Sequence, residues 1–332
     1  MSVITRTPLR PNAIKERRRR GVVAAIFLLP AFILFCLFFV GPGALGLYYS
    51  FTDYKGYGIP EFIGLDNYKG LFTDGDFYAS LTRTFLYTIV TVPFGYILSL
   101  VISALVVSKS AKGATVAQVI FFFPWLISPI VTGVIWRWLF GENFGLVNYL
   151  LSSVGLDPMK WASDPNLALI VVILAGSWGS TAFSMLLFMS AIRNIPNSYL
   201  EAASLDGAGT IIRFVRITWP LLRPTSFMVI LLGTINAMKE FAMIQSLNGG
   251  GPGKSNVLIV QYIYETGFER SQIGYASAVS MILMVILLVI ALIQTRFDRS
   301  DLDRARPHAG SRRPSPCGPS PCCSSSRLHG SC

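Results

Sequence analysis

Residues 271–295 read SQIGYASAVSMILMVILLVIALIQT, a long run that contains no charged side chain. A helix needs about 20 apolar residues to cross the hydrocarbon core of a bilayer. Five further stretches are of similar length and as apolar: residues 22–41, 84–107, 114–136, 167–192 and 225–247. Only the last of these carries charges, Lys239 and Glu240. We therefore predict an all-α, polytopic membrane protein with six transmembrane helices.

The composition of the 332-residue chain agrees with this prediction. Hydrophobic residues make up 52% of it and charged residues only 14%, whereas about 25% is typical of soluble proteins. So few charges could not cover the surface of a soluble fold of this size, which argues against a conventional cytosolic enzyme. Prolines such as Pro30 and Pro93 interrupt the runs, but in a helix bundle neighbouring helices can satisfy the carbonyl groups that a proline leaves free.

The distribution of Lys and Arg indicates the orientation. They concentrate in the N-terminal arm (residues 1–21), between the second and third runs, in the loop 193–223 and in the C-terminal segment 297–332. Because positive side chains favour the cytoplasmic side, we expect both termini there and residues 42–83 outside the cell. The net charge of +11 then reflects topology, not nucleic-acid binding. The run 22–41 is longer than a signal-peptide core, so we predict an uncleaved first helix, followed by a five-helix core over residues 84–296.

Cysteine and histidine are almost absent from the body of the chain. Cys36 is the only cysteine before Cys317, and both histidines lie near the C-terminus. No disulfide framework, metal site or catalytic histidine is therefore expected in the membrane region. The segment 297–332 is expected to be disordered, because its end is rich in Pro, Ser, Arg and Cys. A zinc site formed there is an alternative, although the spacing matches no zinc pattern.

The loop between the fourth and fifth runs, residues 193–223, is the most informative segment. Asn197 or Ser198 can cap a short helix, and Gly207 can end it in the left-handed conformation. A second amphipathic stretch follows and is expected to stop at Pro220. Such a helix pair could rest on lipid headgroups or dock a soluble partner, and the residue types alone favour neither.

Several motifs together resemble those of ABC importer permeases. Glu201-Ala202-Ala203, with Gly207 four positions later and then an Ile-x-x-Pro ending at residue 220, resembles the EAA loop, although Trp219 stands where Leu is usual. Further motifs are similar to the sugar-importing branch of the maltose and multiple-sugar type: FIGLDNY at 62–68, FFPWLISP at 122–129, WRWLF at 136–140 and NGGGP at 248–252. The resemblance covers about residues 22 to 298.

The resemblance implies a type I importer permease fold in a bacterial inner membrane. It implies a non-catalytic subunit that forms half of a sugar pathway, together with a second homologous permease, two ATP-binding subunits and an extracellular sugar-binding protein. ATP and Mg would be bound by the ATPase partner, so this chain would hold no cofactor and no metal. The contact with the ATPase would be formed by Glu201, Ala202, Ala203, Asp206 and Gly207.

A polar solute that crosses apolar helices needs hydrogen-bonding side chains that face a cavity. A sugar ring can stack on an indole, and a carboxylate can accept hydrogen bonds from its hydroxyls. The fourth and fifth runs offer the candidates Trp178, Ser180, Thr181, Asn236, Lys239 and Glu240. The resemblance places Gly176, Ser180, Gly233, Ala237 and Glu240 at the sugar contacts of the maltose type. The same polar groups could instead only bridge helices.

Two other functional interpretations remain. Lys239 and Glu240 could relay ions in a secondary transporter or channel, but that leaves the loop 193–223 unexplained. A membrane-embedded hydrolase would need a nucleophile with a base, and the runs contain no His and no paired carboxylates. Residues 248–255, NGGGPGKS, nearly match a phosphate-binding P-loop, but Asn248 replaces its first glycine and no strand precedes it. We expect an extracellular loop there.

Overall fold

The computed structural model describes residues 11–107 and 113–305. The chain divides into two compact units, Met1–Ala291 and Leu292–Cys332. Regular structure in the described residues is helical, and the extended segments pair only in an isolated antiparallel bridge between Thr52 and Phe62. The predicted all-α class is therefore confirmed.

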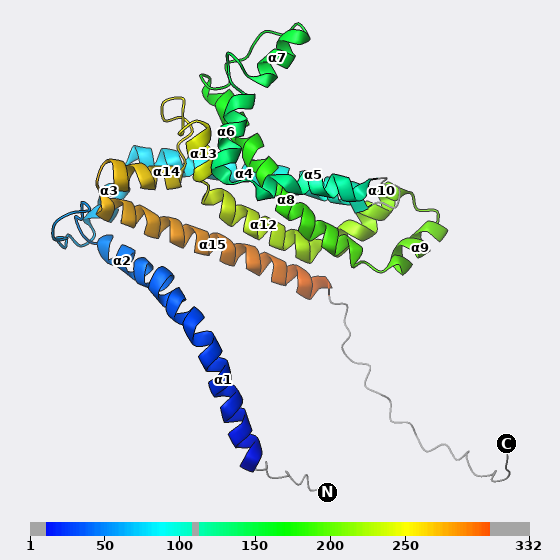
Figure 1. Ribbon diagram of the computed structural model, residues 1–332, viewed down its shortest axis with the longest axis horizontal. Coiled ribbons are helices and arrows are strands. Elements are labelled where there is room, and N and C mark those ends of the chain that lie inside the picture. Colours follow the sequence, from blue (N-terminus) through cyan, green and yellow to red (C-terminus); the bar gives the residue numbers. More distant parts are fainter. Residues whose placement is uncertain (1–10, 108–112, 306–332) are drawn as a thin grey trace, which may run out of the picture. The chain divides into compact units, whose positions relative to one another are not determined.

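The helices follow the apolar runs, with short helices between them (Figure 1). In chain order they are α1 (Pro11–Phe35), the π-helix η1 (Cys36–Val40), α2 (Gly41–Tyr49), α3 (Asp66–Leu71), α4 (Gly75–Val107), α5 (Ala114–Leu126), α6 (Pro129–Leu139), α7 (Leu146–Ser153), α8 (Pro165–Arg193), α9 (Asn197–Leu205), α10 (Thr210–Arg213), the π-helix η2 (Phe214–Thr218), α11 (Trp219–Leu221), α12 (Arg223–Met238), α13 (Ala242–Leu247), α14 (Ile259–Tyr264), the π-helix η3 (Glu265–Glu269) and α15 (Ile273–Ala305).

Four helices are long and apolar enough to cross a membrane. They are Ala25–Tyr49, Gly75–Val107, Pro165–Arg193 and Ile273–Phe297. Two further pairs of helices pass the same test together but are bent at a short break: Thr115–Leu126 with Pro129–Leu139 and Thr210–Leu221 with Arg223–Met238. The described residues hold up to six spans when each pair is counted once, which agrees with the predicted number. The first span extends beyond the predicted run 22–41, and the second begins at Gly75 instead of residue 84.

A proline explains the break in the third span. The sequence predicts one helix over residues 114–136, but the chain turns there through 105°. Ser128 is extended, with a ψ of 141°, because the residue before a proline is sterically kept out of the α region. Pro129 then opens α6 at a position where its missing N–H leaves no hydrogen bond unmade.

The fifth run is also broken, which corrects the expectation of one helix over residues 225–247. Helix α12 ends at Met238 and α13 begins at Ala242. The carboxylate Oε1 of Glu240 accepts hydrogen bonds from the backbone N–H groups of Phe241 and Met243 at 3.2 and 3.3 Å. These N–H groups lie at the start of α13 and lack the carbonyl partners of a continuous helix, so the side chain of Glu240 satisfies them.

The helix after the break in the third span meets the helix that follows Glu240. Helix α6 packs against α13, and at Gly133 a Cβ would lie 2.0 Å from the Ser246 Oγ. Helix α4 packs against α8 and α12. At Gly176 of α8 a Cβ would lie 2.0 Å from the hydroxyl of Tyr87 on α4. Glycines at these crossings let the helices approach closely, as is common in membrane bundles.

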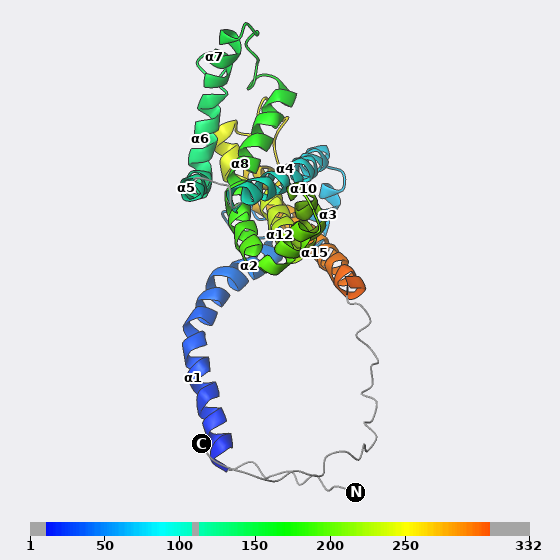
Figure 2. The same ribbon diagram turned by 90° about the vertical axis from the view of Figure 1, so that its right-hand side faces the viewer.

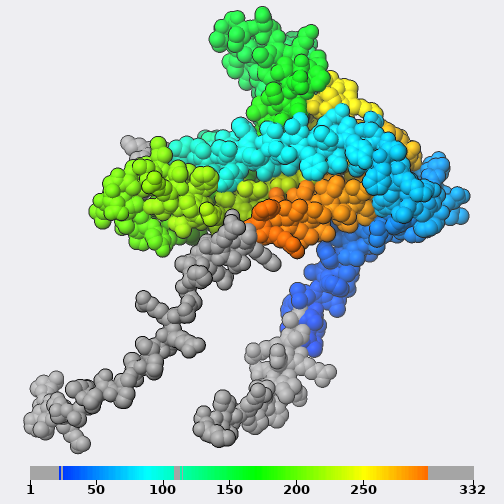
Figure 3. Space-filling model, turned by 180° about the vertical axis from the view of Figure 1, so that it is seen from behind, coloured from blue at the N-terminus to red at the C-terminus, as the bar shows by residue number. Residues whose placement is uncertain are grey.

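The remaining helices frame this bundle. Figure 3 shows α4 beside the first part of α15, and a buried cluster that includes Phe77, Ala278 and Val279 joins them. The segment that carries α7 extends away from α4 and α12 in both ribbon views (Figures 1 and 2). No residue in the most apolar window of the first span is buried.

Helix α15 continues into the second unit as far as Ala305. Residues 297–305 are therefore helical, although the sequence predicts disorder for the whole segment 297–332. The reason is that this stretch contains neither Gly nor Pro before Pro307, so nothing interrupts the helix. The Cys and His residues considered as zinc ligands lie outside the described residues. Within the described ranges no group of His, Cys, Asp and Glu could hold a metal ion.

Candidate functional site

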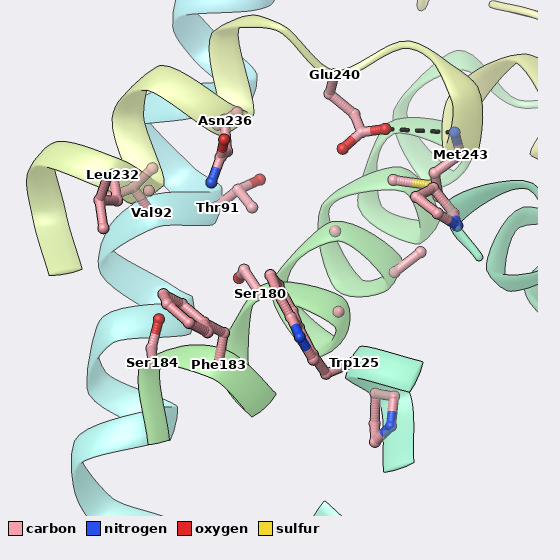
Figure 4. Close-up of a pocket in the computed structure, with 18 of the residues that line it drawn as sticks. Thr91, Val92, Trp125, Ser180, Phe183, Ser184, Leu232, Asn236, Glu240 and Met243 are labelled. Atoms are coloured by element: carbon pink, nitrogen blue, oxygen red, sulfur yellow. Dashed lines mark hydrogen bonds between the residues drawn. The ribbon is translucent and has the colours of Figure 1, made fainter. Parts of the chain in front are cut away.

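A cavity of about 540 Å³ lies among α4, α8, α12 and the break between α5 and α6. Its volume is in the range of small-molecule sites. Most of the lining is apolar. The side chains with polar groups come from all of these elements and are Tyr87, Thr91, Tyr96, Trp125, Thr132, Ser180, Ser184, Asn236, Lys239 and Glu240. Figure 4 shows that Thr91, Ser180, Asn236 and Glu240 surround the same space.

Four of the six side chains predicted for the substrate pathway line this cavity: Ser180, Asn236, Lys239 and Glu240. The other two lie elsewhere. The ring of Trp178 meets Trp136 edge to face, with centroids 6.1 Å apart. Thr181 is buried, and its hydroxyl donates to the carbonyl oxygen of Ser177 at 2.6 Å. Both side chains contribute to helix packing beside the cavity. Gly176, Gly233 and Ala237, which the resemblance singled out, also line it.

The break between α12 and α13 determines how Glu240 meets the cavity. In Figure 4 one carboxylate oxygen points to the N–H of Met243, while the other turns toward the space between Asn236 and Ser180. A carboxylate accepts but does not donate. The free oxygen is therefore suited to a ligand that carries hydroxyl groups.

The aromatic side chains of the cavity are not among the residues that the sequence predicts for the pathway. Trp125 and Phe183 are stacked, with ring centroids 4.7 Å apart and planes 24° apart, and both line the cavity. Tyr87 and Tyr96 of α4 complete this part of the wall. The motif at residues 122–129 marked Trp125 as part of a pattern, but only the packing of α5 against α8 brings its ring to Phe183.

The loop 193–223 contains the short helix that the sequence predicts, but the helix begins differently. The residue before its first turn is Pro196, and no side chain caps it. Asn197 and Ser198 are therefore inside the helix, and the expected side-chain cap is wrong. The end of the helix is as predicted, because Gly207 has a φ of +76°. The N–H of Ala208 donates to the carbonyl oxygen of Ala203 and that of Gly207 to Ser204, which is a Schellman motif.

Pro220 does not stop the second helix of this loop, in contrast to the prediction. The turns α10, η2 and α11 follow one another without a gap, and Pro220 lies inside α11. A proline removes one helical N–H and collides with the carbonyl four residues earlier. The wider turn of η2, directly before α11, relaxes this collision. The chain bends only after Leu221, by 69°.

The five residues expected to contact an ATPase lie close together at the end of α9. Glu201, Ala202, Asp206 and Gly207 are exposed, and Ala203 is half-buried. Leu205 lies between them with 89% of its surface exposed. This end of α9 therefore presents an apolar side chain among charged and small ones.

Two carboxylates outside the spans are held by hydrogen bonds. Asp74 accepts from the hydroxyls of Tyr262 and of Tyr275, the latter at 2.7 Å. Partial burial alone would raise the pKa of Asp74, but these bonds and two backbone N–H groups outweigh it and keep the pKa below its ordinary value. The Ser163 side chain is the main cause that lowers the pKa of Glu142, together with backbone N–H groups. Both groups fix loops at the ends of spans.

The family described as "Binding-protein-dependent transport system inner membrane component" matches residues 70–300, which is most of the chain. The chain belongs to this family. It is therefore an inner-membrane, multi-pass permease component, a non-catalytic subunit of an ABC importer. Membership of this family rules out the secondary-transporter and hydrolase interpretations.

Individual relatives agree with this assignment. The permease is 38% identical over 281 residues to the probable ABC transporter permease protein YesP of Bacillus subtilis, with 83% of this chain and 90% of the relative covered. It is 31% identical over 274 residues to the sn-glycerol-3-phosphate transport system permease protein UgpA of Yersinia enterocolitica, with 82% and 92% covered. Among solved structures it is similar to a chain of a bacterial alginate ABC transporter in complex with an alginate pentasaccharide-bound periplasmic protein. The TM-score is 0.76 and the identity 25%, with 86% of the permease and 96% of that chain covered.

The segment of the permease that nearly matches a P-loop is closed by its own side chains. The amide groups of Asn248 and Asn256 both donate to the carbonyl oxygen of Gly251, at 2.9 and 2.8 Å. The preceding helix is α13, and no strand leads into the segment. The context that a P-loop requires is therefore absent from this part of the described chain.

Proposed function

We propose that this permease forms one half of a membrane pathway for a sugar or a hydroxyl-rich sugar derivative, driven by ATP that partner subunits hydrolyse. The observation that carries the proposal is the cavity at the broken fifth span, where the carboxylate of Glu240 faces stacked aromatic rings. The names of the relatives support the same class of ligand, since sn-glycerol 3-phosphate and alginate both carry hydroxyl groups.

The chemistry of the cavity suits such a ligand. The stacked Trp125 and Phe183 offer an apolar face on which a sugar ring can lie. Glu240, Asn236 and Ser180 offer acceptors and donors for its hydroxyl groups. Because the helix break leaves Glu240 at a terminus next to the cavity, its charge contacts polar groups and not lipid.

The exposed end of α9 is the proposed contact with an ATP-binding subunit. Ala202 and Ala203 are small, so a partner can approach the helix closely, while Glu201 and Asp206 offer charged hydrogen-bond acceptors. The left-handed Gly207 fixes the direction in which the chain leaves the helix. Closure of two ATP-binding subunits would then move this loop, and with it the permease.

The proposed assembly contains a second homologous permease, two ATP-binding subunits and an extracellular sugar-binding protein. It lies in the bacterial cell membrane with both termini of this chain in the cytoplasm, as the distribution of Lys and Arg indicates. This orientation puts the loop 193–223 on the side where ATP is available.

Reconstitution tests the proposal. The permease pair, the ATP-binding subunits and the sugar-loaded binding protein are placed in liposomes, and uptake of labelled sugar is measured with and without internal ATP. We expect uptake that requires both ATP and binding protein. The matched control contains an ATP-binding subunit that cannot hydrolyse ATP. Uptake by this chain alone under an ion gradient would contradict the proposal.

A further inference from the structure

One tyrosine hydroxyl connects the loop 193–223, which we call the coupling loop, with the wall of the cavity. The Nε1–H of Trp219 donates a hydrogen bond to the Tyr96 hydroxyl over 3.1 Å. The same hydroxyl lies 3.0 Å from the Ser226 Oγ. Because the indole can only donate, the Tyr96 oxygen accepts from Trp219, and its own proton is free to bond Ser226. One oxygen therefore joins two partners.

These two partners lie on opposite sides of a bend. Trp219 belongs to α11, the last helical turn of the coupling loop, and Ser226 belongs to the first turns of α12. The two segments meet at 69°. Tyr96 lies on α4, far from both in the sequence. Its hydroxyl thus holds the two arms of the bend to a third helix.

The ring of Tyr96 is itself held firmly. It packs edge to face against Phe188, with centroids 5.5 Å apart and planes 79° apart, and Phe188 is completely buried. The same cluster contains Leu222 at the bend and Val229 of α12, both buried. A ring packed in this way cannot rotate freely. When Trp219 or Ser226 is displaced, the tyrosine ring therefore has to move with it.

The Tyr96 ring is also part of the cavity lining, together with Val229, Leu232 and Asn236 of α12. A movement of the coupling loop that shifts α11 would therefore act on two walls of the cavity at once. We propose that the Tyr96 hydroxyl is the joint through which the coupling loop sets the position of α12 and the shape of the cavity, with Trp219 and Ser226 as its positioning residues. This inference rests on the proposed function.

Three conservative substitutions test the joint in the reconstituted transporter. Tyr96→Phe removes both hydrogen bonds and keeps the ring, whereas Trp219→Phe and Ser226→Ala each remove one. The measured quantity is ATP hydrolysis with sugar-loaded binding protein divided by hydrolysis without it. We expect each single change to lower this ratio about three- to ten-fold, the range that corresponds to one ordinary hydrogen bond, while the ATP-binding subunits still co-purify.

A double substitution distinguishes an effect that passes through the Tyr96 hydroxyl from an effect of packing alone. If Trp219 acts through the Tyr96 hydroxyl, then Tyr96→Phe with Trp219→Phe lowers the ratio no further than Tyr96→Phe alone. Effects that multiply would overturn the proposal, and so would wild-type ratios in the single variants. Tyr78→Phe, at the other end of α4, is the matched control and should leave the ratio unchanged.

The outcomes also separate this inference from the proposed function. If the wild-type assembly shows no stimulation by the loaded binding protein, the proposed function itself has failed. If the wild-type assembly is stimulated normally and the variants have the same hydrolysis ratio, only the proposed role of the Tyr96 hydroxyl is refuted. Should Tyr96→Phe not assemble, Trp219→Phe and Ser226→Ala decide the question, because both keep the tyrosine and its packing against Phe188.

Discussion

Gly133 of α6 and Ser246 of α13 touch so closely that a Cβ on the glycine would lie 2.0 Å from the serine Oγ. This contact joins the second helix of the third span to the short helix that follows Glu240, and the two residues are more than a hundred positions apart in the chain. Only glycine therefore fits at the crossing of α6 and α13.

Replacement of Gly133 is expected to destabilise the protein. The Cβ of Gly133→Ala would also come within 2.3 Å of the Met243 carbonyl oxygen, so the helices would have to separate. We expect a loss of about 1–3 kcal/mol, as for other overpacked sites, visible as a lower midpoint of thermal unfolding in detergent. Gly43→Ala is the control, because a Cβ there meets no atom within 4 Å. Equal midpoints for the two variants would disprove the close crossing.

The loop around Gly207 offers a matched pair of glycines. A Cβ at Gly207 or at Gly209 would meet no atom within 4 Å, but only Gly207 has a positive φ. Gly207→Ala should therefore strain the end of α9 by about 1–2 kcal/mol and reduce the ATP hydrolysis that is coupled to transport, whereas Gly209→Ala should leave it unchanged. Gly207→Pro, whose ring fixes φ near −65°, should abolish coupling while loaded binding protein still docks. Unchanged coupling in Gly207→Pro would refute the role of this turn.

Glu240 is expected to act in transport through its charge. In Glu240→Gln the side-chain oxygen can still accept from the N–H groups of Phe241 and Met243, so the break and the assembled complex should persist. The other carboxylate oxygen is replaced by an NH2 group, which donates hydrogen bonds and cannot accept one from a hydroxyl group. We expect uptake to fall by about ten-fold. Glu240→Ala, which also loses the bonds at the start of α13, should in addition lower stability. Normal uptake by Glu240→Gln would eliminate the carboxylate as a ligand.

The hydrogen bonds of Asp74 are expected to make the stability of the folded protein depend on pH. Its pKa in the folded protein lies below the ordinary value of 3.8, so the ionised form is favoured by folding. The stabilisation that the ionised carboxylate gives to the fold is fully present above pH 3.8. It is lost as the pH falls through the lower pKa that Asp74 has in the folded protein. Asp74→Asn should therefore cost about 1–3 kcal/mol at pH 7, and the difference from wild type should shrink below pH 4. Thermal midpoints measured over this pH range in detergent check the sign. Tyr275→Phe, which removes one donor, should show a smaller effect of the same sign, and a difference that grew on acidification would contradict the assignment.

Much of the fold could be read from the amino-acid sequence. A bilayer requires about 20 apolar residues per span, so the runs of apolar residues were sufficient to predict the all-α class and the number of spans. The end of α9 at Gly207 was likewise predictable, because a left-handed turn depends on the local residue type. Where α9 begins, and that the helical turns continue past Pro220, could not be predicted, because both depend on turn geometry that neighbouring contacts select.

The sequence indicated only some of the residues of the candidate site. Polar residues in apolar runs, such as Ser180, Asn236 and Glu240, stand out because they are costly in a membrane. Phe183 and Tyr96 did not stand out, and Trp125 did so only as a member of the motif at residues 122–129, because aromatic residues are ordinary members of apolar spans. Only their neighbours in space distinguish them.

The sequence by itself determined which segments are helical, which of them can span a bilayer and to which family the chain belongs, because these properties depend on residue types at short range. The tertiary structure decided where the third and fifth spans bend, that α6 meets α13, and that side chains of α4, α5, α8 and α12 enclose one cavity. The physical reason is that lipid is as apolar as the helix surfaces, so burial does not select the partner of a helix. That choice depends on close contacts such as Gly133 with Ser246 and on hydrogen bonds such as Trp219 with Tyr96.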